Sequence, residues 1–243
     1  GEAIASKYPN DYRIIDDADV LFAESFERDD WANNWSYVHT EHELVTSNDN
    51  ENFAPLMGKA LQSKLVTGDL TALNAAYKFA EKVGADQEEV YFRYNLRFGS
   101  TWETLLGGKL PGIAGTYHNT EYVGGWGGRT SNGTNGWSAR GIFKPVLKGN
   151  NTFSEQVPIG NYIYHADQAG TWGDSIIYDG ARPGVLEKSK WYSIEQYVKI
   201  NTPGKNDGII RAWIDGEIAY ERKDLKFRNE GYDNIKIDRV WMN

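Results

Sequence analysis

Two short motifs in the sequence carry side chains that could bind an acidic group and move a proton. Ser138 and Arg140 are two positions apart, as are Tyr162 and Tyr164. Residues two apart on a β-strand share a face of the sheet. A guanidinium pairs bidentately with carboxylates, and a phenol near a cation is stabilised in its ionised form, which makes it a candidate for proton transfer. The two motifs predict an anion site on a sheet, although the tyrosines could also be core residues or surfaces for stacking sugars.

A third candidate, Lys109, lies in the glycine-rich segment GGKLPGIAG at residues 107–115. A phosphate-binding loop needs Ser or Thr after the lysine and then a helix, but Leu110 and Pro111 follow here, so phosphate binding is not expected. Glycines without a Cβ would instead let the backbone and Lys109 approach a flat ligand closely. The alternative is an ordinary loop with a solvated lysine.

Further candidates for ligand contacts surround these motifs. They are Arg93 and Arg97 on a predicted strand, Trp126 and Arg129 in the stretch GGWGGR, and His118 and His165 near the other motifs. Each arginine taken alone is more often a surface or ion-pair residue. Because Arg93, Arg97 and Arg140 all lie on polar strand faces, we expect several guanidinium groups to face one acidic ligand.

The elements that would position these residues are mostly strands. Residues 90–98 alternate with a period of two, residues 138–144 alternate similarly, and the last third predicts strands at 191–200, 209–214, 217–221 and 235–242 with a hairpin at Asp215-Gly216. The apolar stretch at 20–26 predicts another strand. Residues 69–84 predict one short helix capped by Asp69 and Gly84, although an aromatic strand could show the same pattern.

Composition agrees with an all-β protein. The 243 residues include 9 Trp, 15 Tyr and 26 Gly against 2 Met, a balance more typical of a β-sandwich or barrel than of a helix bundle. The length suits one large domain, so we expect a single domain over residues 1–243. No linker, low-complexity tract or repeat interrupts it.

Charge is unevenly distributed along the chain. The net charge is −8, which argues against a nucleic-acid partner, yet residues 91–148 contain seven basic and two acidic residues and carry +5 against −13 for the remainder. A basic island in an acidic protein predicts a local anion site.

Several classes of site and partner are not expected. With no Cys there are no disulfides or thiol nucleophiles, and the four His lack metal-ligand spacing. We expect no required cofactor; structural calcium stays open because the acidic loops at 16–19 and 48–51 offer oxygen ligands without EF-hand spacing. No apolar run of membrane-spanning length occurs, so we expect no membrane partner.

The order of these motifs resembles the polysaccharide lyases of family 14 and the related glucuronan lyases of family 20. The likeness covers roughly residues 90–227, through VYFRYNLRF, GGKLPGIAG, GWSARGIF, GNYIYHAD and WYSIEQYVKINTPGKNDGIIRAWIDG. It implies a β-jelly roll of two antiparallel sheets, with a concave face for an acidic polysaccharide such as alginate or glucuronan, cleaved by β-elimination. Residues 1–89 and the loop at 126–135 do not follow the resemblance.

Carried over by motif, the resemblance makes Lys109 the catalytic lysine, Ser138 and Arg140 the substrate-contacting pair, and Tyr162 and Tyr164 the active-site tyrosines. β-Elimination requires that the charge developing beside a uronate carboxylate be offset, a role for Arg140 with Arg97 as a second candidate. Lys109 would be the base or charge stabiliser and a tyrosine its proton-handling partner, with the division of roles left open.

The resemblance also implies an acidic polysaccharide as partner. We expect a monomer, and a secreted or periplasmic protein whose signal peptide has been removed. Two alternatives stay open. One is a non-catalytic carbohydrate-binding sandwich whose Trp and Tyr residues stack on sugars and whose basic residues hold an acidic glycan. The other is a glycoside hydrolase on the same architecture, although paired carboxylates with the spacing of sandwich hydrolases are absent.

Overall fold

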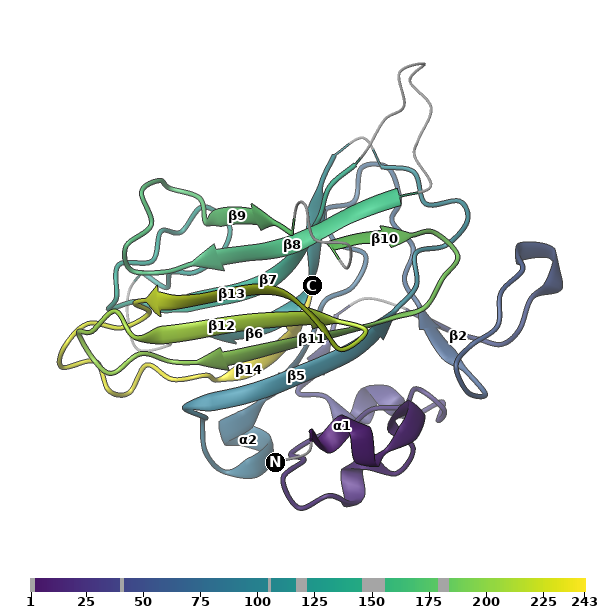
Figure 1. Cartoon of the computed structure of the whole chain (residues 1–243), viewed down its shortest axis with the longest axis horizontal. Helices are drawn as coiled ribbons and strands as arrows, with labels where there is room; N and C mark the ends of the chain where they lie inside the picture. Colours follow the sequence, from purple (N-terminus) through teal and green to yellow (C-terminus); the bar gives the residue numbers. More distant parts are fainter. Residues whose placement is uncertain (1–2, 40–41, 105, 117–121, 146–155, 179–183) are drawn as a thin grey trace.

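The computed structural model describes residues 3–39, 42–104, 106–116, 122–145, 156–178 and 184–243 (Figure 1). Its largest element is an eight-stranded sheet. From edge to edge this sheet consists of β1 (Tyr37–Val38), β4 (Ala75–Lys78), β14 (Arg239–Met242), β6 (Gly108–Gly115), β7 (Trp137–Phe143), β8 (Gln156–Tyr164) and β10 (Val185–Glu187), with β9 (Asp174–Ile177) also paired to β8.

A second sheet of four strands forms the other layer, in the order β13 (Glu217–Leu225), β12 (Gly208–Ile214), β11 (Tyr192–Lys199) and β5 (Glu89–Leu96) (Figure 1). Strands β2 (Glu43–Val45) and β3 (Ala60–Gln62) pair separately. All pairings of the described strands are antiparallel. The predicted all-β jelly-roll sandwich is confirmed, and so is the 215–216 hairpin, where both residues have positive φ.

The helices of the described residues are all short. The described residues contain α1 (Ile4–Lys7), α2 (Phe79–Val83) and the 3₁₀ turns η1 (Pro9–Asp11), η2 (Ile14–Asp16), η3 (Trp31–Asn34) and η4 (Asp49–Glu51). Most of these lie in the N-terminal segment, which Figure 1 shows below β5. Outside these short turns, the backbone of the N-terminal segment is mostly irregular.

The core lies between the two sheets. Ile113, Trp137 and Ile163 from the eight-stranded sheet pack in one cluster with Val198 and Ile210 from the four-stranded sheet, and all are buried. Alternate residues of a strand point to opposite faces. The intervening residues of β6, β7 and β8 therefore face away from the four-stranded sheet.

The strand predicted at residues 20–26 is absent, which corrects that expectation. Phe22 and Phe26 are partly buried against the core by side-chain contacts alone: the Phe22 ring stacks on Tyr77 at 4.0 Å and the Phe26 ring meets Trp31 edge-on at 5.2 Å. An apolar run predicts burial, but a strand also needs a partner for its backbone hydrogen bonds.

The helix predicted at residues 69–84 is mostly wrong. Residues 75–78 form β4, which is hydrogen-bonded to β1 and β14, and only residues 79–83 are helical. Pairing on both edges and burial of Ala75 and Tyr77 outweigh the helical spacing of the apolar residues. Gly84 does end the helix in the left-handed conformation, as predicted.

Ile163 offers a test of this core from the strand that also carries both tyrosines. Its side chain is fully buried, so Ile163→Ala should lower the free energy of unfolding by about 2–5 kcal/mol through lost burial and a cavity. The matched control is Ile218→Ala in β13, an exposed isoleucine, which should change stability by about 0.5 kcal/mol or less. Urea unfolding measures both, and equal losses would contradict the assigned faces.

Candidate active site

Strand register gathers five of the predicted site residues on one sheet face. Across β6, β7 and β8, Lys109 is opposite Ile142, Arg140 is opposite Tyr162, and Ser138 is opposite Tyr164. Their neighbours Ala139 and Ile163 belong to the core. We call the opposite face of the eight-stranded sheet, marked by Lys109, Ser138, Arg140, Tyr162 and Tyr164, the site face.

The two tyrosines form a hydrogen-bonded pair. The Tyr162 hydroxyl donates to the Tyr164 hydroxyl over 3.2 Å, and the backbone N–H of Gly128 donates to the Tyr164 hydroxyl over 3.0 Å. Tyr164 is fully buried and Tyr162 is 7% exposed. Burial, followed by the bond to Tyr164, raises the pKa of Tyr162 well above its usual value, so this phenol is protonated at neutral pH.

Arg140 has an unfilled hydrogen-bonding capacity. Its side chain is only 4% exposed, its Nη1 donates to Asn243 Oδ1 over 2.8 Å, and its Nε is buried with no partner in the described residues. The guanidinium lies 4.6 Å from the Trp241 ring and 5.9 Å from the Tyr162 ring. Burial lowers its pKa to about 10. A buried guanidinium with a free N–H and no carboxylate partner suits an anionic ligand.

Lys109 brings its amine to the same place. Its Nζ lies 4.9 Å from the centre of the Tyr162 ring, and the Arg140 guanidinium lies near the same ring. Partial burial of the amine, followed by the positive charges of Arg140 and Lys144, lowers the pKa of Lys109. Each of these effects favours the neutral amine, the form that accepts a proton.

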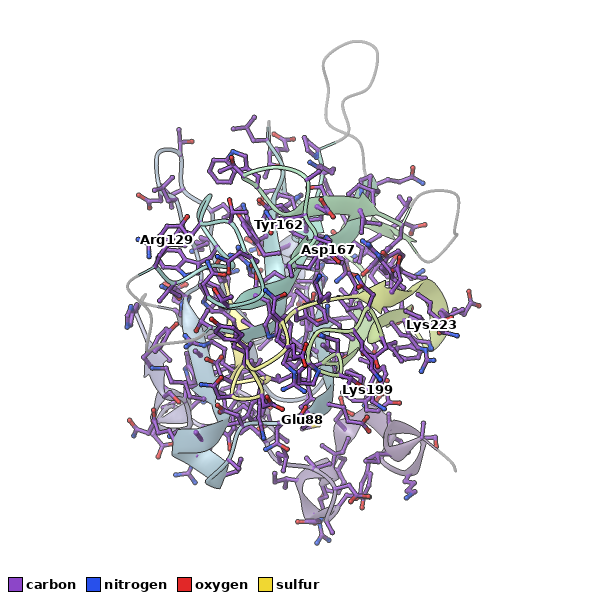
Figure 2. The ribbon with its side chains drawn as sticks, turned by 90° about the vertical axis from the view of Figure 1, so that its left-hand side faces the viewer. Glu88, Arg129, Tyr162, Asp167, Lys199 and Lys223 are labelled. Atoms are coloured by element: carbon purple, nitrogen blue, oxygen red, sulfur yellow. The ribbon has the colours of Figure 1, made fainter. Side chains whose placement is uncertain are left out.

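Ser138 holds a neighbouring loop. Its buried hydroxyl donates to the carbonyl of Gly125 over 2.5 Å. From there the chain turns through Trp126 to Arg129, whose guanidinium stacks 4.1 Å from the Trp126 ring, and Gly128 in this turn contacts Tyr164. Trp126 and Arg129 therefore lie in the turn that contacts Tyr164, and their role in ligand binding stays a prediction. Figure 2 shows Arg129 and Tyr162 on the same side of the molecule.

Arg93 and Arg97 are not part of this cluster, which corrects the expectation of guanidinium groups converging on one ligand. Arg93 lies on β5, where it forms ion pairs with Asp11 and Glu195, and Arg97 donates to the Asn52 carbonyl over 3.2 Å. The alternate residues of β5, such as Tyr94, pack in the core. The polar face of β5 thus forms the outer surface of the other sheet.

His165 is also turned away from the site face. Its Nε2 lies 2.5 Å from Asp174 Oδ2, and Asp174 in turn lies 4.0 Å from Arg222 on β13 of the four-stranded sheet. A residue directly after Tyr164 points to the opposite side of the strand, so proximity in sequence misplaced it. His118 lies outside the described residues.

Four further residues at the site were not predicted. Trp241 and Asn243 contact Arg140, and Lys144 lowers the pKa of Lys109. Trp172, 62% exposed, covers Gly128, where an added Cβ would lie 3.0 Å from its ring. Only Lys144 carried a signal in the sequence, as a member of the basic island.

The described residues contain neither a cluster of metal-ligand side chains nor a membrane-spanning helix. Among them no three His, Cys, Asp or Glu side chains are grouped as metal ligands. None of the described helices is long and apolar enough to cross a membrane. The calcium expectation stays a prediction.

The fold and this cluster define a β-sandwich whose larger sheet presents a cationic, tyrosine-lined face. Residues 60–243 match the family model described as polysaccharide lyase 14, and the chain belongs to this family. A search of curated protein sequences gave no match.

Solved structures of alginate lyases share the fold. The marine family 14 alginate lyase from Aplysia kurodai has a TM-score of 0.60 at 18% identity, over 90% of this chain and 85% of that one. A double mutant of alginate lyase Aly36B in complex with an alginate trisaccharide has a TM-score of 0.54 at 23% identity, over 70% and 64%. The alginate lyase from Chlorella virus scores 0.50 at 17% identity, over 70% and 66%. The match thus spans 64% of the length of the Aly36B structure and 66% of that of the viral enzyme.

The electrostatic coupling between Lys144 and Lys109 is directly testable. In Lys144→Met one repelling positive charge is lost, so the pKa of Lys109 should rise toward its ordinary value. NMR titration of the lysine side chains measures the midpoint of the Lys109 amine. The Lys109 signal is assigned as the one that disappears in Lys109→Arg. Lys199→Met is the control, since Lys199 lies on the four-stranded sheet (Figure 2). An unchanged or lower midpoint in Lys144→Met would refute the coupling.

Proposed function

We propose that this protein is a polysaccharide lyase that cleaves a uronate polysaccharide by β-elimination. Family membership supports the reaction class. The observation that carries the proposal is the buried Arg140, with an unpaired Nε and no carboxylate partner in the described residues, on the same sheet face as Lys109 and Tyr162. Such a group is suited to the carboxylate of a uronate.

Arg140 has the first task in this scheme. Removing the proton at C5 of a uronate places new negative charge beside a carboxylate that is already charged. A fixed guanidinium in a buried, low-dielectric position stabilises that charge more strongly than water does. Its guanidinium, which no carboxylate of the described residues neutralises, supplies the positive charge.

The proposed scheme divides the proton-transfer roles between Lys109 and Tyr162. Lys109 takes the proton from C5, a role in keeping with the lowered pKa of its partly buried amine beside Arg140 and Tyr162. The raised pKa of Tyr162 keeps the phenol protonated. Once its O–H turns from Tyr164 to the substrate, Tyr162 donates to O4 as the C4–O4 bond breaks and the electrons of the C5–H bond form the C4–C5 double bond. Exchange with water then restores both groups. Tyr164 supports Tyr162 rather than meeting substrate, because it is fully buried.

The substrate class follows from charge. In β14, β6, β7 and β8, the residues on the site face include Lys109, Arg140 and Arg239 and no Asp or Glu. A polyanion complements such a face. Alginate is the first polymer to test, because the Aly36B complex holds an alginate trisaccharide on a similar fold.

The decisive experiment follows ultraviolet absorbance of new unsaturated uronates on polymannuronate, polyguluronate, glucuronan and hyaluronan. The wild type should give an absorbance rise on at least one polymer. Lys109→Ala should lose about 10²–10⁴-fold in rate with folding intact, because general acid–base groups contribute that much. Lys199→Ala, on the opposite sheet, should keep the wild-type rate.

Other outcomes would replace the proposal. New reducing ends without an absorbance rise would indicate a hydrolase. Polymer binding by a folded protein without any product would indicate a non-catalytic binding module. More than about a tenth of the wild-type rate in Lys109→Ala would remove Lys109 from the base role.

A further inference from the structure

The site face extends well beyond the cluster around Arg140. Cross-strand pairing continues the row of Tyr162 and Arg140 through Gly112 on β6, Trp241 on β14 and Ala76 on β4 to Tyr37 on β1. Paired residues in antiparallel strands share a face. The row therefore crosses the sheet from the candidate active site to its β1 edge.

From Tyr37 to Arg140, large and small side chains alternate along this row. Aromatic rings at Tyr37, Trp241 and Tyr162 are separated by Ala76 on one side and by Gly112 and Arg140 on the other. Trp241 links the two ends: its ring contacts Arg140 at 4.6 Å, and its Nε1 donates to Asn74 Oδ1, just before β4, over 3.3 Å. The pattern places three aromatic residues at intervals along a row perpendicular to the strands, which we call the aromatic path.

Lys78 is the cation at the far end of this path. It is paired with Arg239 across β4 and β14, and its Nζ lies 5.6 Å from the centre of the Tyr37 ring. Its neighbour Arg239 is already held by Asp238, with Nε to Oδ1 at 2.8 Å. Within the described part of the chain Lys78 forms no ion pair within 4.0 Å, so its charge is available to a ligand.

Tyr37 and His39 complete the surroundings of Lys78. The two rings lie 4.3 Å apart and are tilted by 38°, and the Tyr37 backbone is fixed by pairing with Ala76. The backbone N–H of His39 donates to the Asn74 carbonyl over 2.9 Å. The Nζ of Lys78 thus lies over a ring whose backbone is fixed by strand pairing and whose neighbour is the tilted imidazole of His39.

This end of the site face is built partly from chain outside the matched family region. The family match begins at residue 60, whereas Tyr37 and His39 lie on and just after β1. The N-terminal segment therefore adds an edge strand, and two aromatic side chains, to a sheet that the family region otherwise forms. That addition places the Tyr37 ring against Lys78, and His39 beside Tyr37, on the face that carries Arg140.

We propose that Lys78, with Tyr37 and His39, forms a distal subsite that binds the carboxylate of a uronate residue several sugars away from the one that reacts. This inference rests on the proposed function. Three strand spacings separate β4 from β7, about 14 Å, so one extended polymer lying along the aromatic path would contact both Arg140 and Lys78. The subsite would favour long chains over short ones, because short oligosaccharides bound at Arg140 do not reach Lys78.

The test compares Lys78→Gln with Lys223→Gln, which removes a lysine from the outer face of the other sheet (Figure 2). On the polymer that the wild type cleaves, Lys78→Gln should raise KM about three- to fivefold, as expected for one partly exposed ion pair, and leave kcat unchanged. On the shortest oligosaccharide that is cleaved, KM should not change. Lys78→Arg should restore the wild-type KM, and the difference should shrink at high salt.

Equal KM values for Lys78→Gln and Lys223→Gln on the polymer would overturn the subsite, and so would an equal rise in KM on the short oligosaccharide. Absence of unsaturated product from every polymer with the wild type would instead refute the proposed function. In that event calorimetric titration of the folded proteins with polymannuronate still tests the subsite. Weaker binding by Lys78→Gln than by Lys223→Gln would support it, and equal binding would overturn it.

Discussion

The antiparallel register of β6, β7 and β8 is the constraint on which the rest of this protein depends. It places Arg140 opposite Tyr162 and Ser138 opposite Tyr164, while Ala139 and Ile163 enter the core. Because side chains alternate with a period of two, a slip of one residue would move the whole polar set into the core and the core residues to the surface. The fully buried residues on the other face therefore maintain the geometry of the site.

Aromatic rings make it possible to crowd positive charges on this face. Burial and then the charge of Arg140 lower the pKa of Lys109, yet both cations lie near the ring of Tyr162. Trp241 provides a second ring for Arg140. The negative face of an aromatic ring attracts a cation without neutralising it as a carboxylate would. The cations therefore stay available to an anionic ligand.

Residues of the basic island at 91–148 do not all lie on one surface of the folded protein. Arg93 and Arg140 belong to the same island of sequence but project from different sheets, and Arg93 is neutralised by Asp11 and Glu195. Lys78, outside the island, joins the site face through β4. Which cations share a surface depends on strand order, and β14 inserts between β4 and β6 although it comes last in the chain.

The sequence by itself determined the class of fold, the strands that carry Arg140 and Tyr162, and the hairpin at 215–216, because period-two alternation and turn residues are local signals. The strand that carries Lys109 was not predicted, because the glycine-rich segment 107–115 shows no such alternation. Tertiary structure decided the rest. Residues 75–78 became a strand because both neighbours paired with them, and His165 turned inward because it follows Tyr164 by one position. The contact of Trp241 with Arg140 joins residues about 100 positions apart. Such contacts arise from long-range pairing, which no local pattern encodes.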